Sequence, residues 1–272
     1  MVTFRKLGRF GRFGNQLFQY AGTRLYAETQ GFDFAMPHWI GCDILEGIKS
    51  HTLAQKLKTL ALPTTQLEDV KSYGMVDKIK FLLGLTNDLP KTCSLRKLYQ
   101  NPRDNINFYG YFQDEFSLKL LQENKLRVKS WFTFKKEIDE VYKKATTGLE
   151  PYVGLHIRWG DLIKRKANLP LESYLETLDK IRGQRNVYIA TDSPELINKL
   201  SYLKPARVKN PLSAIPDYIF DFWMLKNAAT IIGGGSTFSW WAAYLGSGGY
   251  YSPPLSHLWQ GASKTKISKQ EI

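Results

Sequence analysis

The first candidate for chemistry is Arg158, which follows the apolar run Tyr152–Ile157 inside the block HIRWGD. The run predicts a buried parallel strand, and alternation along it sends His156 and Arg158 to the same face. Arginine presents a planar fork of donors that matches two phosphate oxygens and stays charged at every relevant pH. We therefore expect Arg158 to bind an anion, with His156 and Asp161 as candidate catalytic groups beside it. The competing interpretation is a structural arginine paired with Asp161 across a turn.

The second candidate is the run Gly233–Gly235 followed by Ser236 and Thr237, where an apolar strand gives way to a helix. Glycines permit unusual dihedral angles and close approach of the backbone to a ligand. The helix start offers N–H groups and a positive dipole end, to which the two hydroxyls add donors. The segment therefore suits phosphate, although it is not a P-loop because no Gly-Lys-Ser/Thr follows. A glycine turn with an ordinary serine cap is the alternative.

The third candidate is the glycine-rich loop over 8–14, which leads into Gly14, Asn15 and Gln16 in the other half of the chain. Side-chain amides both donate and accept hydrogen bonds, as contacts to sugar hydroxyls require. We expect a sugar contact here, with an ordinary turn as the alternative, because a lone glycine-rich loop is a weak signal.

Charge and metal-binding patterns limit the ligands that fit these motifs. The 272 residues carry a net charge of +13, which suits nucleic acid, an anionic membrane surface or a polyanionic small ligand. The charge is dispersed, and its densest cluster, Lys164–Lys166, follows the HIRWGD block. Because no Asp-x-Asp pair is available to hold a metal against a diphosphate, we expect protein groups to neutralise that charge. Cys42 and Cys93 have no zinc-binding spacing.

Strand and helix patterns alternate in the second half of the chain. Strands are predicted at Tyr152–Ile157, Asn186–Thr191 and Thr230–Ile232, with helices over 171–182, from Ser193, over 214–229 and over 236–245. This alternation predicts a parallel α/β sheet, in which ligands bind beyond the carboxyl ends of the strands. The HIRWGD block and the Gly233–Gly235 run both lie at such ends.

The first half has fewer clear elements. We predict a strand over 2–7, a helix over 15–29, a strand over 106–112 and a helix over 115–123, and we leave 40–105 unassigned. A helical segment over 130–150 ends in a Gly148 and Pro151 stop signal, which places a domain boundary there. No apolar run reaches the roughly 18–20 residues of a membrane span, and the N-terminus lacks the apolar core of a signal peptide. We expect a cytoplasmic protein whose basic surface can rest on the inner membrane face.

These motifs occur together, in this order, in the α-1,2-fucosyltransferase family, whose bacterial members the chain resembles from end to end. The matching blocks are GRFGNQLFQYA (11–21), GYFQDEF (110–116), HIRWGD (156–161), YIATDS (188–193) and DFWMLKNAATIIGGGSTFSWWAAYLG (221–246). The GRFGNQ block is also similar to the opening loop of protein O-fucosyltransferases. Any one block identifies little, whereas five blocks in order are a specific pattern.

The resemblance implies a GT-B fold of two facing Rossmann-like domains with parallel sheets. These are an acceptor-side domain over 1–135 and a GDP-sugar-binding domain over 136–272. The resemblance also implies inverting, metal-independent transfer of L-fucose from GDP-β-L-fucose to the 2-hydroxyl of a galactoside in an oligosaccharide.

The resemblance also implies roles for single residues. Arg158 stabilises the departing GDP, and Asp192 contacts the guanosine. The resemblance further implies two groups of donor contacts. Ser236, Thr237 and Phe238 bind the diphosphate, and Gly14, Asn15 and Gln16 approach the sugar. Inversion in one displacement also requires removal of the acceptor proton. Asp161 and His156 are the alternatives for that base, and Asp161 can instead orient Arg158.

The chain departs from the family at two positions. Trp159 replaces the second arginine of the usual HxRRGD, and Gly235 replaces the usual asparagine before STFSWW. We expect Trp240 and Trp241 to be buried rather than to stack on sugar. Other functions stay open: a GDP-sugar transferase with a different acceptor, including a protein, a nucleic-acid-binding protein, or an inactive nucleotide-sugar-binding module.

Overall fold

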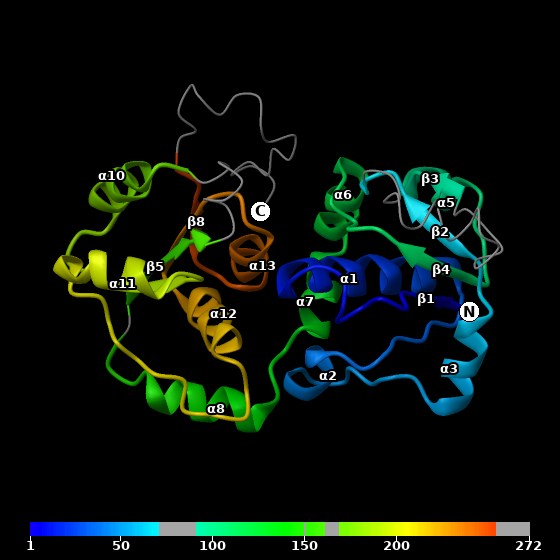
Figure 1. Ribbon diagram of the computed structural model, residues 1–272, viewed down its shortest axis with the longest axis horizontal. Helices are drawn as coiled ribbons and strands as arrows, with labels where there is room; N and C mark the ends of the chain where they lie inside the picture. The colour runs from blue at the N-terminus through cyan, green and yellow to red at the C-terminus, as the bar shows by residue number, and fades with distance from the viewer. Residues whose placement is uncertain (71–90, 150, 161–168, 254–272) are drawn as a thin grey trace. The chain divides into compact units, whose positions relative to one another are not determined.

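The computed structural model describes residues 1–70, 91–149, 151–160 and 169–253. The chain divides into two compact units, Met1–Thr133 and Phe134–Ile272. Each unit carries a four-stranded sheet whose strand pairs are all parallel, with helices packed on it (Figure 1). The predicted α/β class with parallel sheets is confirmed.

The sheet of the first unit has the order β1-β4-β2-β3. Its strands are β1 (Val2–Thr3), β2 (Thr64–Leu67), β3 (Lys91–Cys93) and β4 (Ile106–Tyr109). The helices of this unit are α1 (Phe13–Gln30), α2 (Ile40–Ile44), α3 (Leu53–Leu60), α5 (Leu95–Gln100), α6 (Glu115–Glu123) and α7 (Lys125–Trp131). The strands predicted over 2–7 and 106–112 are both shorter than expected. The Leu7 amide donates to the Phe4 carbonyl in a turn, and Phe112 adopts a left-handed φ of 57°.

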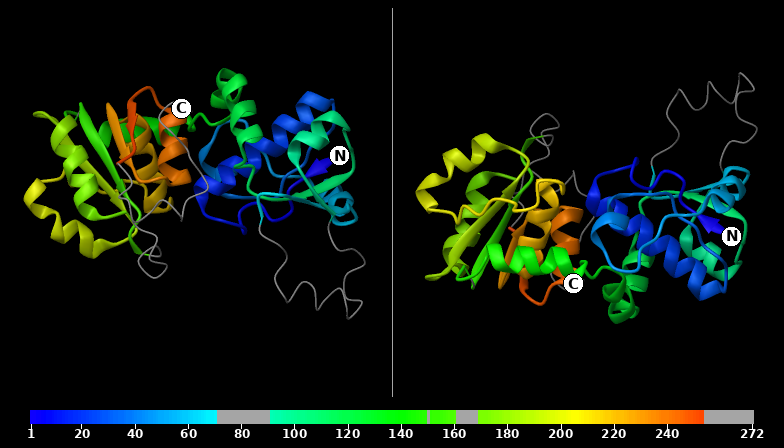
Figure 2. Two further views of the ribbon diagram at one scale, coloured as in Figure 1. Left: turned by 90° about the horizontal axis from the view of Figure 1, so that it is seen from above. Right: turned by 90° about the horizontal axis from the view of Figure 1, so that it is seen from below.

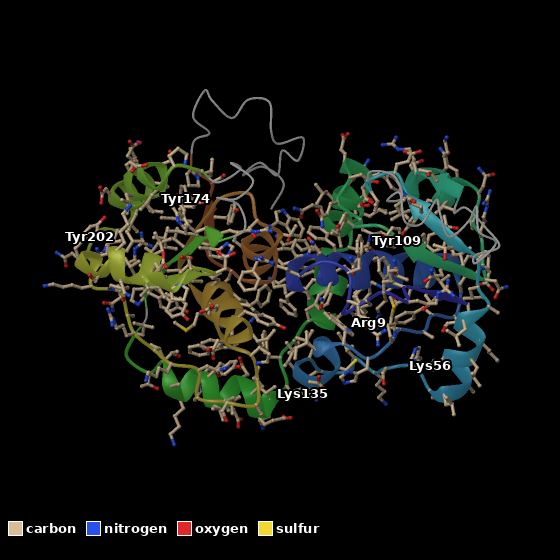
Figure 3. All side chains as sticks on the ribbon, in the orientation of Figure 1. Arg9, Lys56, Tyr109, Lys135, Tyr174 and Tyr202 are labelled. Atoms are coloured by element: carbon tan, nitrogen blue, oxygen red, sulfur yellow. The ribbon has the colours of Figure 1, made fainter. Side chains whose placement is uncertain are left out.

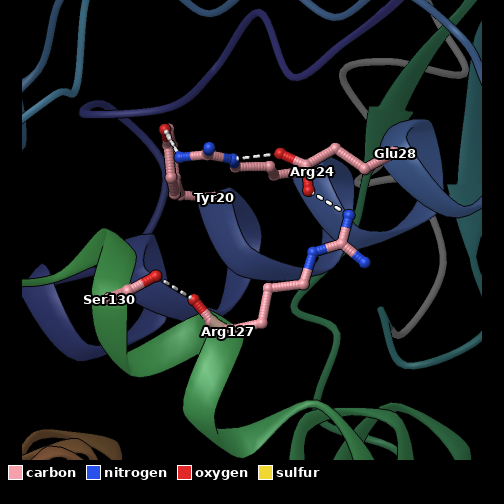
Figure 4. A network of polar contacts seen from close by, with 5 residues as sticks. All are labelled: Tyr20, Arg24, Glu28, Arg127 and Ser130. Carbon is pink, nitrogen blue, oxygen red and sulfur yellow. Dashed lines mark hydrogen bonds and ion pairs between the residues drawn. The ribbon is translucent and has the colours of Figure 1, made fainter.

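Helix α1 is fastened to α7 by a network of charged side chains (Figure 4). Arg24 Nε lies 2.5 Å from Glu28 Oε1, and Arg127 of α7 pairs with the other oxygen of Glu28. The Arg24 guanidinium also lies 4.3 Å from the centre of the Trp131 ring, a cation–π contact. These contacts fix the helix whose first turn carries the candidate Asn15.

The sheet of the second unit has the order β6-β5-β7-β8. Its strands are β5 (Tyr152–Ile157), β6 (Asn186–Thr191), β7 (Thr230–Gly233) and β8 (Gly249–Tyr251). Its helices are α8 (Lys136–Ala145), α10 (Leu171–Ile181), α11 (Pro194–Lys199), the 3-10 turn η1 (Ser201–Leu203), α12 (Asp217–Asn227) and α13 (Thr237–Leu245). The strands predicted here match closely, whereas α12 starts three residues later than predicted because Pro216 precedes it in a non-helical conformation.

The two faces of this sheet are covered by different helices (Figure 2). Leu155 and its neighbours at alternate positions of β5 are buried in an apolar cluster with residues of α10 and α11. On the other face, Tyr152 Oη donates to the Met224 carbonyl of α12 at 2.7 Å. A Cβ at Gly154 would lie 2.8 Å from Leu225 Cδ2, so this glycine lets α12 approach the sheet closely. Residues that alternate with Leu155 therefore lie on the α12–α13 face.

Helix α13 is mostly apolar, and all of its residues after Phe238 are buried. Trp240 and Trp241 are both 0% exposed, so the prediction that they are buried is confirmed. The Trp240 ring stacks on Tyr244 with centres 5.0 Å apart. Among the described residues, no helix combines the length and apolarity needed to cross a bilayer.

Candidate active site

His156 lies near the carboxyl end of β5, on the α12–α13 face, in register with Gly233 of β7. It is 8% exposed, and its ring centre lies 5.1 Å from that of Phe238. Burial, aided by the charge of Arg158 and opposed by that of Asp192, lowers the pKa of His156 to about 4. Its Nδ1 has no hydrogen-bond partner within the described residues. His156 is therefore neutral at neutral pH, with a buried nitrogen that a ligand or water can satisfy.

Arg158 follows β5 directly and is partly exposed. The residues on either side of it, Ile157 and Trp159, pack against the apolar cluster on the opposite face of the sheet. Alternation therefore carries Arg158 on the face of His156, and its charge contributes to the lowered pKa of that histidine. Asp161 lies outside the described residues, so its two predicted roles stay predictions.

Asp192 follows β6, the strand beside β5, and holds the loop that carries Arg158. Its Oδ1 accepts the backbone N–H of Trp159 at 2.7 Å and that of Gly160 at 2.9 Å. Two amides on one carboxylate oxygen are charge-assisted hydrogen bonds, which are stronger than neutral ones. The predicted contact of Asp192 with the guanosine stays a prediction. The loops after the two neighbouring strands are joined by this single side chain.

The start of α13 has the geometry expected of an anion site. Ser236 is its buried N-cap, and Ser236 Oγ accepts the Phe238 amide at 3.3 Å. A capping hydroxyl keeps its own hydrogen as a donor. A Cβ at Gly234 would lie 1.8 Å from Oη of Tyr174, which Figure 3 marks on α10, and Gly235 has a φ of 70°. Any side chain at Gly234 would therefore clash with Tyr174, whereas Gly235 requires glycine or a residue that tolerates left-handed backbone.

Those predicted residues of the second unit that the structure describes lie at one end of its sheet. His156 and Gly233 are paired across β5 and β7, and Gly233 leads within three residues to Ser236. Thr237, the first residue of α13, is partly exposed beside this cap. The elements therefore present one arginine, one neutral histidine and one helix start to the same region, a combination that favours a bound diphosphate.

A carboxylate that sequence reasoning missed lies beside a cavity at the β6 edge. The cavity has a volume of about 560 Å³, and its lining includes Tyr188, Thr191, Arg207, Lys209, Asp217 and Asp221. Asp221 Oδ1 accepts a hydrogen bond from Tyr188 Oη at 2.6 Å. Burial raises the pKa of Asp221 to about 6 in spite of that bond. The signal in the sequence was one carboxylate inside the otherwise apolar stretch IFDFWML.

The glycine-rich loop of the first unit is held by its own side-chain amides. Gln16 is buried, and its Nε2 donates to the Gly11 carbonyl at 3.1 Å. Asn15 Oδ1 accepts from Gln113 Nε2 at 3.0 Å, and Gly14 is buried in the first turn of α1. Gln16 therefore stabilises the loop, while Asn15 is the more exposed of the two amides.

Asp69, which follows β2, supports the same loop. Its carboxylate accepts the amides of Tyr111 at 3.0 Å and Gln113 at 3.1 Å, and burial raises its pKa. It lies in the stretch over 40–105 that had no readable periodicity, so sequence reasoning missed it. Asp69 fixes the backbone of the residue that contacts Asn15.

Within the described residues, no group of three His, Cys, Asp or Glu side chains could hold a metal ion. Metal independence stays a prediction, because it concerns the reaction and not the presence of a cluster. Cys42 and Cys93 are not joined in a disulfide.

No protein-family model matches the chain. An α-1,2-colitosyltransferase from Escherichia coli is 25% identical over 271 residues, covering 86% of this chain and 85% of that protein. The solved structure of NodZ α-1,6-fucosyltransferase with GDP aligns with a TM-score of 0.57 and 17% identity, over 90% of this chain and 92% of that one.

A second solved structure, POFUT1 in complex with GDP, aligns with a TM-score of 0.55 and 13% identity, over 93% of this chain and 98% of that one. The fold is that of the GT-B fucosyltransferases. Both alignments cover most of the two chains, so the similarity to these fucosyltransferases includes both units. At such identities the structural likeness shows the fold alone, because one fold carries many functions.

Proposed function

We propose that this chain is a GDP-sugar-dependent glycosyltransferase of the fucosyltransferase type. It transfers L-fucose from GDP-β-L-fucose to the 2-hydroxyl of a galactoside, with inversion and without a metal. One observation carries the proposal: Arg158, His156 and the Ser236 cap lie at the carboxyl end of one parallel sheet. Such ends are where open α/β sheets bind ligands.

In the proposed reaction, the acceptor oxygen bonds to the fucose carbon as the bond from that carbon to the diphosphate oxygen breaks. The acceptor proton passes to a base, and GDP leaves with its negative charge. Arg158 and the amide end of α13, with Ser236, Thr237 and Phe238, stabilise that charge, a contribution worth roughly 100–1000-fold in rate for one such group. His156, with a pKa of about 4, is a weak base, and Asp161 is the alternative.

The cavity beside β6 is our proposed site for the base of the nucleotide. It extends to Thr191, which pairs with Ile157 immediately before Arg158. Guanine offers two adjacent donors, an N–H and an amino group, to a single carboxylate, and Asp221 supplies that acceptor. Uracil has no amino group and adenine no adjacent ring N–H, so Asp221 favours GDP over UDP and ADP.

In the first unit, we propose that Gly14, Asn15 and Gln16 serve the sugar side of the reaction. Asn15 is the residue of this group with a partly exposed amide, and Gln113 orients it through the bond to Oδ1. The units thereby take the roles that the resemblance implied: acceptor side for the first and donor side for the second.

A second candidate for the transferred sugar is colitose, favoured by the relative that is named as a colitosyltransferase. Both candidates keep the GDP site and differ only in the sugar. Incubation with GDP-fucose or the GDP-linked form of colitose, with β-galactosides as acceptors, separates them. NMR of the product reads the linkage. Transfer of neither sugar, with intact GDP-fucose recovered, would refute the proposal.

We further propose peripheral contact with an anionic membrane through α3. Leu53, Leu57 and Leu60 form one stripe of this helix and are 71%, 60% and 58% exposed. Lys56, marked in Figure 3, and Lys58 are exposed beside the stripe, and the net charge of +13 favours anionic lipid. We expect sedimentation with phosphatidylglycerol vesicles, and its loss in a Leu53→Ser, Leu57→Ser variant. Equal sedimentation of both proteins would refute this contact.

A further inference from the structure

Trp159 occupies the position at which the α-1,2-fucosyltransferase family usually has a second arginine. Contacts fix both its ring and its backbone. The ring packs against the apolar cluster on the α10 face of the sheet. The backbone N–H donates to Asp192 Oδ1 at 2.7 Å, and Gly160 donates to the same oxygen at 2.9 Å. On the other side of Arg158, Ile157 is 0% exposed in the same cluster. Arg158 is thus held between two anchored neighbours.

We propose that Asp192 and Trp159 are positioning residues that hold Arg158 against the donor diphosphate, a role that rests on the function proposed above. An arginine side chain loses about 2 kcal/mol of rotamer entropy when it is fixed. A rigid backbone at its root reduces the motion that the diphosphate must stop on binding. A displacement of about 1 Å in such a group can cost roughly 100-fold in rate.

The first unit contains a similar arrangement, although at a different position in its sheet. Asp69 follows β2 and accepts the amides of Tyr111 and Gln113, which follow the neighbouring strand β4. In both units, a carboxylate beyond one strand fixes the loop beyond the next strand. In the first unit that loop orients Asn15 through Gln113. In the second it carries Arg158.

In this role Trp159 needs no positive charge, unlike the second arginine that the family usually has at this position. The ring of Trp159 is used for packing, so this residue contributes to the donor site through the loop and not through charge. Restoring the family residue with Trp159→Arg places a guanidinium against the apolar cluster, at a cost in burial. We expect that variant to transfer sugar more slowly than the wild type, and Trp159→Phe to stay within about threefold of it.

Two substitutions of Asp192 separate positioning from direct donor contact. Asp192→Asn keeps an oxygen that accepts both amides, and we expect kcat within about threefold of the wild type. Asp192→Ala removes the acceptor, and we expect kcat to fall by roughly 10–100-fold. In a protein that already carries Arg158→Ala, adding Asp192→Ala should lower kcat little further, because both substitutions remove the same interaction of Arg158 with the diphosphate. Glu195→Ala, which deletes an exposed carboxylate at the start of α11, is the control and should behave as the wild type.

Hydrogen exchange of the Trp159 and Gly160 amides tests the contact without a donor. Both amides should be protected in the wild type and in Asp192→Asn, and should exchange rapidly in Asp192→Ala. The proposal is overturned if protection is equal in all three proteins. It is also overturned if Asp192→Asn lowers kcat as much as Asp192→Ala does. The same holds if the fold-losses in kcat of Arg158→Ala and Asp192→Ala multiply in the double variant. A wild type that neither binds GDP nor transfers fucose refutes the proposed function instead, while the exchange result still decides the contact.

Discussion

The ring centres of His156 and Phe238 lie 5.1 Å apart with their planes tilted by 34°. This contact joins the end of β5 to the first turn of α13, so the elements expected to hold the leaving diphosphate touch directly. Phe238 also packs edge-on against Phe222 of α12, at 5.3 Å. The imidazole is therefore buried among aromatic rings, which disfavours its charged form.

His156 should make the protein sensitive to acid. Its pKa is about 4 in the folded protein against 6.5 in the unfolded chain. The unfolded state therefore takes up a proton first, and the histidine's contribution to stability is lost as pH falls from about 6.5 to 4. At 1.36 kcal/mol per pKa unit, the loss is at most about 3–4 kcal/mol. Urea unfolding of His156→Gln should lack this slope, and an unchanged slope would contradict the assignment.

Asp221 should have the opposite effect, because its pKa is raised from 3.8 to about 6. Here the folded state takes up the proton first, so this contribution to stability is complete below pH 4 and lost as pH rises through 6. Asp221→Asn should be more stable than the wild type at pH 8, by at most about 3 kcal/mol, and should bind GDP more weakly. The control Glu195→Gln removes an exposed carboxylate that is not among the residues lining the cavity and should show no such stabilisation. A destabilised Asp221→Asn at pH 8 would refute this account.

Ser236 should serve both stability and binding. Ser236→Ala removes an N-cap, which costs about 1 kcal/mol, and a hydroxyl donor to the diphosphate, which costs roughly tenfold or more in GDP affinity. Ser94→Ala is a matched control, because Ser94 caps α5 with the same 3.3 Å bond to a backbone amide. We expect the control to lose similar stability and no affinity. Equal GDP affinity in the two variants, measured by calorimetry, would remove Ser236 from the donor site.

Substitutions of Gly234 and Gly235 should differ in how much they lower the stability of the protein. Gly234→Ala should cost about 1–3 kcal/mol, as overpacking does, because the new methyl meets Tyr174 Oη at 1.8 Å. Adding Tyr174→Phe should recover part of that loss. Gly235→Asn introduces the family's usual residue at a φ of 70° with open space around it, so it should cost less than 1 kcal/mol. Thermal unfolding of the three variants tests this order, and a Gly235→Asn that is less stable than Gly234→Ala would contradict it.

The second half of the chain could be read from its sequence because its strands are apolar and its helices regular. β5 and β6 have the predicted bounds, and the residues at their ends lie at one end of the sheet. The Ser236 cap was recognisable because a strand, three glycines and a helix follow one another there. The role of Trp159 was not, because the sequence shows neither the cluster its ring meets nor the oxygen its amide contacts.

The first half resisted reading for a physical reason. β1 has two residues and α2 has five, too few for a period of two or 3.6 to show. Such short elements are stabilised by tertiary contacts, such as the Val2 amide of β1 donating to the Asp33 carbonyl at 2.7 Å. Asp69 lies among these short elements. Asp221 was missed for another reason: a single carboxylate in an apolar helix gains its meaning from Tyr188, which is 33 positions away in the chain.

Calorimetric titration of GDP and GMP into the wild type and Arg158→Ala tests most directly whether Arg158 binds the diphosphate of GDP. The account predicts that GDP binds the wild type and loses at least tenfold in affinity in the variant, because a hydrogen-bonded charge pair is removed. GMP lacks the second phosphate and should lose much less. Equal GDP affinity of a folded Arg158→Ala and the wild type would contradict the account.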